Sequence, residues 1–175
     1  MKIDFEKVGI IASYFAEHTN ELYVTKLLKL FYYLDFISYK TRGTSVTNDV
    51  YFKMPYGPVP SSIKDNIDFL STENIIGKEY KSQFSPYIKL QKDIENGGNL
   101  IISKGKEYTL RKLSNFEIEL VKCLAETFKD TKAKTLSSKT HLEKPWLSTS
   151  DFAVIDYCLA DGLNVAKILP TFSGK

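Results

Sequence analysis

The sequence predicts a mostly helical α+β fold: a compact bundle of about five to seven helices with a small inserted antiparallel β-hairpin or three-stranded meander. Several stretches place apolar residues at helical spacing, whereas the segment around residues 87–110 alternates and contains turn signals. The chain has 175 residues, of which 43% are hydrophobic and 26% charged. That length and composition suit one domain over residues 1–175 with a buried core.

The first two helices are expected at residues 4–18 and 24–40. In the first, apolar side chains recur at helical spacing and Asp4 is placed to cap the N-terminus. The second, VTKLLKLFYYLDFISYK, has leucine and aromatic side chains over a broad arc, which predicts a central helix packed by several neighbours. Gly43 follows as a helix stop.

The polar residues of the second helix carry two further predictions. On a helical projection, the side opposite the apolar arc carries Lys26, Lys29, Lys40 and Tyr33. Asp35 falls inside the apolar arc, and an unpaired buried carboxylate is costly. We therefore expect a backbone N–H, a tyrosine hydroxyl or a lysine to satisfy it, so that it pins a neighbouring loop. A catalytic carboxylate is the alternative.

A proline-rich stretch precedes the third helix. Residues 52–60 read FKMPYGPVP, in which three prolines surround Gly57. Because proline lacks the backbone N–H that a phosphate cradle requires, this stretch is not expected to bind anions. We interpret it as a rigid joint leading into a helix at residues 61–70, where Ser62 and Asp65 resemble a capping box.

The β-structure is expected in the next segment. Residues 87–91 alternate, Asn96-Gly97-Gly98-Asn99 is a strong turn signal, and residues 100–102 follow as a short strand. Residues 108–110 are a candidate third strand. A lone hairpin is only marginally stable, so this element should pack on the helical body.

Helical spacing resumes after the hairpin. Ser114 and Glu117 form a capping-box pattern before FEIELVKCLAETF. A shorter helix is expected at residues 133–143, ending before Pro145, and one or two short helices are expected from Asp151 onward.

The sequence predicts no cofactor and no metal site. Its two histidines, His18 and His141, and its two cysteines, Cys123 and Cys158, lack zinc spacing. The phosphate-loop motifs are also missing. An S-x-x-K pattern begins at Ser61, but without its companion elements we interpret this serine as a helix-capping residue.

Composition also bears on compartment and partners. Sparse cysteines predict a reducing compartment, the N-terminus lacks a signal-peptide pattern, and no apolar run reaches the roughly 18 residues that a membrane span needs. We expect a cytoplasmic protein without membrane contact. The net charge is only +3 and Arg42 and Arg111 are the only arginines, so sequence-specific nucleic-acid recognition is not expected.

Several of these features occur together in one known family. They are an aromatic helix with an aspartate, here Lys26 to Asp35, then Gly43, then the turn Gly57-Pro58-Val59, and finally His141-Leu142-Glu143-Lys144-Pro145-Trp146. The pattern resembles the SocA-like antitoxin domain, also called the Panacea domain and found in phage-associated GepA-type proteins. The resemblance covers about residues 26–157.

The resemblance implies an antitoxin of a two-gene toxin–antitoxin system that neutralises a cognate toxin protein by direct binding, with a protease as a further partner when the toxin is delivered for degradation. It implies no catalytic residues. The positions expected to define the fold are Asp35, Gly43, Gly57, Pro58 and Val59. The positions expected to contact the partner are Tyr56, Gly57, Pro58, His141 and Trp146.

Two alternatives stay open. One is a small hydrolase or nucleotide-handling enzyme with Asp35 and His141 in a cleft, which would lose function in His141→Ala at unchanged stability. For a protein that is not an enzyme, we expect His141 to pack or to cap, with its ring bonded to a backbone group. The weaker alternative is a transcriptional autoregulator, which a gel-shift assay on its own promoter would test.

Overall fold

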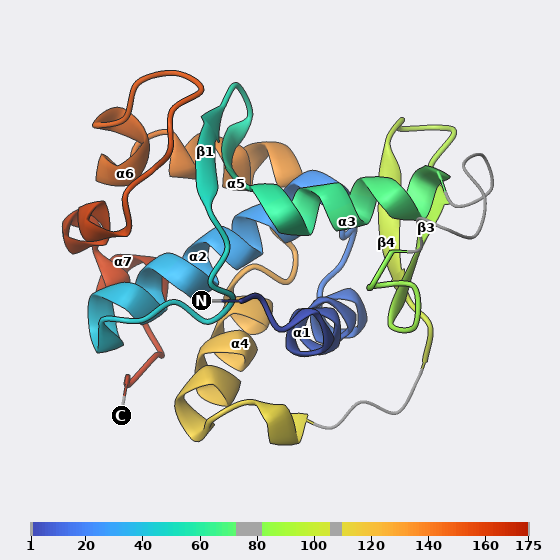
Figure 1. The fold of residues 1–175 in the computed structure, drawn as a ribbon, viewed down its shortest axis with the longest axis horizontal. Helices are drawn as coiled ribbons and strands as arrows, with labels where there is room; N and C mark the ends of the chain where they lie inside the picture. The colour runs from blue at the N-terminus through green and yellow to red at the C-terminus, as the bar shows by residue number, and fades with distance from the viewer. Residues whose placement is uncertain (1, 73–81, 106–109, 175) are drawn as a thin grey trace.

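The computed structural model describes residues 2–72, 82–105 and 110–174, and confirms a mostly helical α+β fold (Figure 1). In chain order the elements are α1 (Phe5–His18), α2 (Val24–Arg42), β1 (Tyr51–Met54), β2 (Gly57–Pro60), α3 (Ser61–Thr72), β3 (Ile88–Lys92), β4 (Asn99–Ser103), η1 (Leu110–Lys112), α4 (Asn115–Thr127), α5 (Ala133–Thr140), α6 (Lys144–Leu147), η2 (Tyr157–Gly162) and α7 (Val165–Ile168).

Helix α2 runs through the middle of the molecule, as its apolar arc predicts (Figure 1). It contacts α3, α4, α5, β2, β4 and η2, and every residue from Lys26 to Ser38 is buried. The helix ends at Gly43, which adopts the left-handed conformation with φ of 73° and donates its N–H to the Tyr39 carbonyl at 2.8 Å. The predicted helix stop is therefore confirmed.

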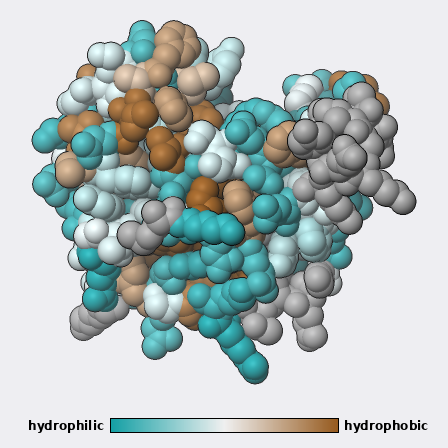
Figure 2. Space-filling view, viewed as in Figure 1, coloured by the Kyte–Doolittle hydropathy of each residue, from teal (hydrophilic) through white to brown (hydrophobic). Residues whose placement is uncertain are grey.

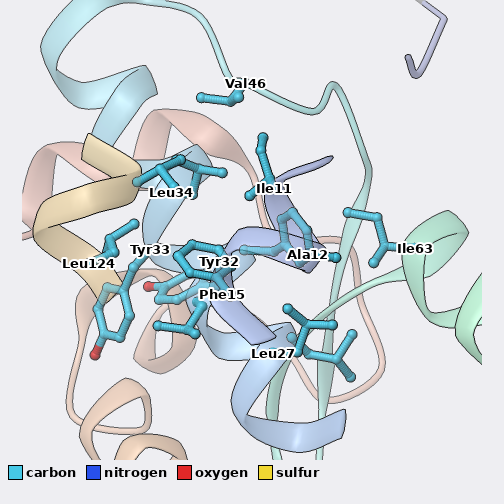
Figure 3. Close-up of a cluster of buried hydrophobic side chains, with 14 of the residues drawn as sticks. Ile11, Ala12, Phe15, Leu27, Tyr32, Tyr33, Leu34, Val46, Ile63 and Leu124 are labelled. Carbon is cyan, nitrogen blue, oxygen red and sulfur yellow. The ribbon is translucent and has the colours of Figure 1, made fainter. Parts of the chain in front are cut away.

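The hydrophobic core forms where α2 meets α1 and α4 (Figure 3). The labelled side chains at its centre include Ile11, Ala12, Phe15, Leu27, Tyr32, Tyr33, Leu34 and Leu124. Burial of each large apolar side chain contributes about 1.5–3 kcal/mol, so this contact holds the helical body together.

Of the four residues on the polar side of α2, only Lys40 is exposed. Lys26, Lys29 and Tyr33 are all at most 1% exposed, because α2 has neighbours on every side. Lys26 extends along the packed surface and donates to the carbonyls of Asn20 and Lys129 at 2.7 and 2.9 Å. A buried ammonium needs such acceptors, and only a long side chain reaches them.

Two separate antiparallel hairpins are present. The predicted one joins β3 to β4, with Gly97 and Gly98 at positive φ in its turn, and it packs against α1. Residues 108–109 of the candidate third strand lie outside the described residues, and Leu110 begins a 3₁₀ helix. The second hairpin is β1–β2, formed by the proline-rich stretch. What the sequence indicated as a rigid joint is thus also a strand pair.

The predicted helix caps are confirmed at α1 and α4. The Asp4 carboxylate accepts from the Lys7 N–H at 3.0 Å, and Ser114 and Glu117 form a complete capping box. These signals are local in sequence, which explains why they were predictable.

Helix α3 begins at residue 61 as predicted, but its cap differs from expectation, and so does the end of α5. Helix α3 begins at Ser61, and its first N–H groups, including that of Ile63 at 2.8 Å, donate to the distant Asp49 carboxylate. The proposed capping box at Ser62 therefore does not begin this helix. Helix α5 ends at Thr140, and Pro145 lies in the first turn of the separate helix α6, where its missing N–H costs nothing.

Candidate partner-binding site

The hairpin tip, residues 54–57, presents Tyr56 to solvent on a fixed base. The Tyr56 side chain belongs to a residue that is 77% exposed, whereas Gly57 and Pro58 are buried. Gly57 has φ of 105°, and a Cβ there would lie 2.6 Å from Cε of Lys29. Only glycine allows this backbone angle and this close approach.

Two side chains anchor the backbone of the tip by hydrogen bonds. The Lys29 ammonium donates to the Pro58 carbonyl at 2.8 Å, and Ser137 of α5 donates to the Tyr56 carbonyl at 2.6 Å. Burial lowers the pKa of Lys29 to about 7. Helices α2 and α5 thus fix the backbone at the exposed tyrosine and two residues after it.

Asp35 is a buried structural carboxylate, as the structural interpretation predicted. One oxygen accepts from the backbone N–H groups of Val46 and Thr47, both at 2.8 Å. The other accepts from the Thr47 hydroxyl at 2.5 Å and the Tyr51 hydroxyl at 2.8 Å. Burial raises its pKa to about 6, against the lowering effect of these hydrogen bonds. With no exposed surface, Asp35 cannot act with His141 in an open cleft.

His141 and Trp146 pack against each other and are half-buried. Their rings stack at 4.2 Å between centroids, and the Lys53 ammonium lies 4.7 Å from the Trp146 ring centroid. His141 follows the last residue of α5, but within the described residues its buried Nε2 has no hydrogen-bond partner, so the expected bond to a backbone group is not made at this atom. Burial, with repulsion from Lys29 and Lys53, lowers the pKa of His141.

Glu143 is a half-buried acid that the sequence did not single out. Its two oxygens accept from the hydroxyls of Tyr32 and Tyr33, each at 3.0 Å. Burial raises its pKa to about 7. It borders a pocket of about 410 Å³ that Phe128 and Lys139 also line. The sequence signal that could have predicted this acid is the pair of adjacent tyrosines on α2, because buried hydroxyls need hydrogen-bond acceptors.

Within the described ranges, no group of three or more His, Cys, Asp and Glu side chains is arranged to hold a metal ion. Nor does the described part of the chain contain a helix that is long and apolar enough to cross a bilayer.

Comparison with protein families gives one match. The family described as antitoxin SocA-like, Panacea domain, matches residues 27–147, which is more than half of the chain. The chain belongs to this family. No curated protein and no solved structure matches the sequence significantly. The matched residues of this SocA-like antitoxin domain run from Leu27, the fourth residue of α2, to the end of α6 and include the hairpin tip.

The surface around the hairpin tip of this Panacea domain is apolar. Figure 2 shows brown and tan spheres gathered over β1 and over the chain that follows α6. The exposed apolar residues of the hairpin tip, the end of α6 and the chain that follows it are Met54, Tyr56, Leu147, Phe152 and Val154. Of these, the sequence singled out only Tyr56, because periodicity does not indicate which residues of a non-helical loop face solvent.

Proposed function

We propose that this Panacea-domain protein is the antitoxin of a two-gene system and neutralises a cytoplasmic toxin protein by direct contact through the surface around the hairpin tip. Family membership supports the antitoxin role. The single observation that favours this surface is the exposed Tyr56 on a backbone that Lys29 and Ser137 already fix. A side chain on an ordered base loses little entropy on binding, and tyrosine is enriched among residues that dominate interface energies.

Neutralisation provides the test. The protein is co-expressed with the product of an adjacent reading frame that is toxic alone, and growth is scored. We expect wild type to restore growth and Tyr56→Ala to weaken toxin binding by about tenfold or more, as loss of a central anchor typically does. The thermal midpoint should not change, because Tyr56 is exposed.

The matched control is Ile94→Ala, which removes an 89% exposed apolar side chain from the turn of the other hairpin. It should bind the toxin as wild type does. If Tyr56→Ala also binds normally, the hairpin tip is structural only. If no adjacent product is toxic and neutralised, the antitoxin proposal itself fails.

His141 and Trp146 belong to the proposed surface as its half-buried border, where they support the hairpin through Lys53. Delivery of the toxin to a protease is a finer part of the proposal. It predicts that the toxin's half-life in cells shortens when this protein is present, whereas neutralisation by binding alone leaves the half-life unchanged or longer.

A further inference from the structure

Residues 152–155, here called the strand edge, add a third extended segment to the β1–β2 hairpin. The Lys53 N–H donates to the Ala153 carbonyl at 2.9 Å, and the Ile155 N–H donates to the Tyr51 carbonyl at 2.8 Å. These two bonds flank an antiparallel bridge between Phe52 and Val154. Strand β1 is therefore covered on both sides, and the open side of this small sheet is the strand edge.

The N–H and C=O of Val154 point away from β1. Val154 and Phe52 form a pair that is not itself hydrogen-bonded, because the bonds are made by the residues on either side, and in such a pair each residue directs its own N–H and C=O away from the other strand. Among the described residues, neither backbone group of Val154 makes a hydrogen bond, and the residue is 53% exposed. Such an edge is a template for pairing with another extended chain.

Phe152 occupies an unusual position in the same segment. Its N–H donates to the Lys53 carbonyl at 2.9 Å, so Phe152 and Ala153 together oppose Lys53 in a β-bulge. Its φ is 63°, a left-handed angle that glycine adopts freely and a phenylalanine resists. The residue is nevertheless 65% exposed, so burial of its ring does not compensate the backbone strain. Backbone strain of this kind concentrates at functional positions.

A pocket beside Val154 indicates the chemistry of the missing strand. It has a volume of about 400 Å³ and is lined by Val50, Tyr51, Val154, Ile155, Asp156 and Tyr157. The lining is mainly apolar, and Asp156 is its one charged side chain. At the other end of the strand edge, the exposed Asp151 already pairs with Lys53 at 3.1 Å. The complementary segment therefore carries an aliphatic side chain for the pocket and a Lys or Arg facing Asp156.

We propose that an extended segment of the toxin pairs with the strand edge as an additional β-strand, with backbone bonds to Val154 and with Phe152 as the aromatic anchor. The inference rests on the proposed antitoxin function and specifies how the toxin binds. An extended chain is the occupant because the unpaired N–H and C=O of one strand residue require a backbone with the complementary pair. Residues 152–155 lie outside the matched part of the Panacea domain.

The first test removes one backbone donor. Val154→Pro deletes the outward N–H but leaves the bonds of Lys53 and Ile155 to the strand edge in place, and proline is tolerated on an edge strand whose N–H faces outward. The control, Val154→Ala, keeps the N–H. With the toxin identified by the growth assay, we expect at least tenfold weaker binding for Val154→Pro and less than threefold for Val154→Ala. Equal affinities for wild type and Val154→Pro, with wild-type melting, would overturn the inference while the antitoxin function stands.

The second test separates binding from stability. Phe152→Gly relieves the left-handed strain, so its thermal midpoint should rise, and it removes the anchor, so its toxin affinity should fall tenfold or more. A merely structural phenylalanine would lower the midpoint on removal and leave affinity unchanged, and that result counts against the proposal.

The third test requires no variant and decides the matter if Val154→Pro does not fold. NMR-detected hydrogen exchange should find the Val154 amide unprotected in the free protein and protected in the toxin complex. An unprotected Val154 amide in a tight complex places the toxin elsewhere and overturns the inference. Protection in the free protein that increases with its concentration assigns the edge to a second copy of this chain, which also overturns it. If no toxin is neutralised at all, the antitoxin proposal and this inference fall together.

Discussion

Asp35 and the strand edge are opposites within one small molecule. At Asp35, both carboxylate oxygens are saturated by donors from Val46, Thr47 and Tyr51, and the group has no exposed surface. At the strand edge, backbone groups of Val154 lack partners within the described residues and a strained aromatic residue faces solvent. In the first region, every polar atom of the carboxylate has its hydrogen-bond partners within the chain. The second has unpaired backbone groups that, in our proposal, the toxin completes, so motif residues and contact residues need not coincide.

The largest effect on stability is expected at Asp35. Asp35→Ala leaves two backbone N–H groups and two hydroxyls buried without an acceptor, which should lower the free energy of unfolding by about 3–5 kcal/mol. Urea denaturation measures this loss. Asp65→Ala, at an exposed carboxylate of α3, is the control and should change it little. A loss for Asp35→Ala below about 1 kcal/mol would mean that the loop does not depend on this carboxylate.

The next effect is a pH dependence of stability that arises from the half-buried acid Glu143. Its pKa is raised from 4.5 to about 7, so the unfolded chain loses this proton first and the free energy of unfolding falls as the pH rises from about 4.5 to about 7. The fall from this group is about 3 kcal/mol at most. Lys29 has the opposite sign: its pKa is lowered from 10.5 to about 7, so stability rises again above pH 7. Denaturation measured between about pH 4.5 and pH 10.5 should therefore reveal a minimum in the free energy of unfolding near pH 7.

The variant Glu143→Gln tests how much of this pH dependence Glu143 causes. Its free energy of unfolding should fall less than that of wild type between pH 4.5 and pH 7. The smaller fall that Asp35 causes, with its pKa of about 6, should remain. Glu126→Gln, at an exposed position of α4, should keep the wild-type profile. An unchanged slope in Glu143→Gln would show that this carboxyl titrates alike in the folded and unfolded states.

A smaller effect is expected at the hairpin tip. Gly57→Ala places a Cβ 2.6 Å from Cε of Lys29 and 2.8 Å from Oγ1 of Thr140, at a φ of 105°. We expect a loss of about 1–3 kcal/mol in unfolding free energy. Gly43→Ala is the matched control, since it also has a positive φ, 73°, but nothing within 4 Å. Equal losses in the two variants would mean that the close packing on Lys29 contributes nothing.

The smallest effect is predicted for His141→Ala. The buried Nε2 has no partner within the described residues, so the substitution removes mainly the stacking on Trp146, worth about 1 kcal/mol. Toxin neutralisation in the growth assay should persist. Complete loss of neutralisation with unchanged melting would instead show that the His141 side chain takes a direct part in function, as a toxin contact or in a site that does not use Asp35.

Local signals in the sequence predicted much of the fold. The central helix, its stop at Gly43, the Asn96–Asn99 turn and the capping box at Ser114 depend on residues within a few positions of one another. The role of Asp35 was also predictable, because a carboxylate on an apolar arc must find donors. Such predictions succeed where the structure depends on residues close in sequence, or where burying an unpaired group would cost too much free energy.

The rest depends on contacts between distant segments. Lys29 is buried because β2 and α5 close over it, and α3 is capped by Asp49, which lies outside that helix. The left-handed angle of Phe152 follows from the pairing of its segment with β1, about a hundred residues earlier. No periodicity in the sequence encodes such long-range pairings, and for this reason the strand edge was missed while Tyr56, inside a proline-rich motif, was found.

The pairing between β1 and residues 152–155 has a consequence for how this protein can be changed. The bonds that hold the segment in place join backbone atoms only, at Tyr51, Lys53, Phe152, Ala153 and Ile155. The exposed side chains of Phe152 and Val154 are therefore free to vary without dislodging the segment, whereas Ile155 is anchored in the core. If the toxin pairs with this segment as proposed, exchanging Phe152 and Val154 for the residues of a relative should change which toxin is recognised and leave the helical body unchanged.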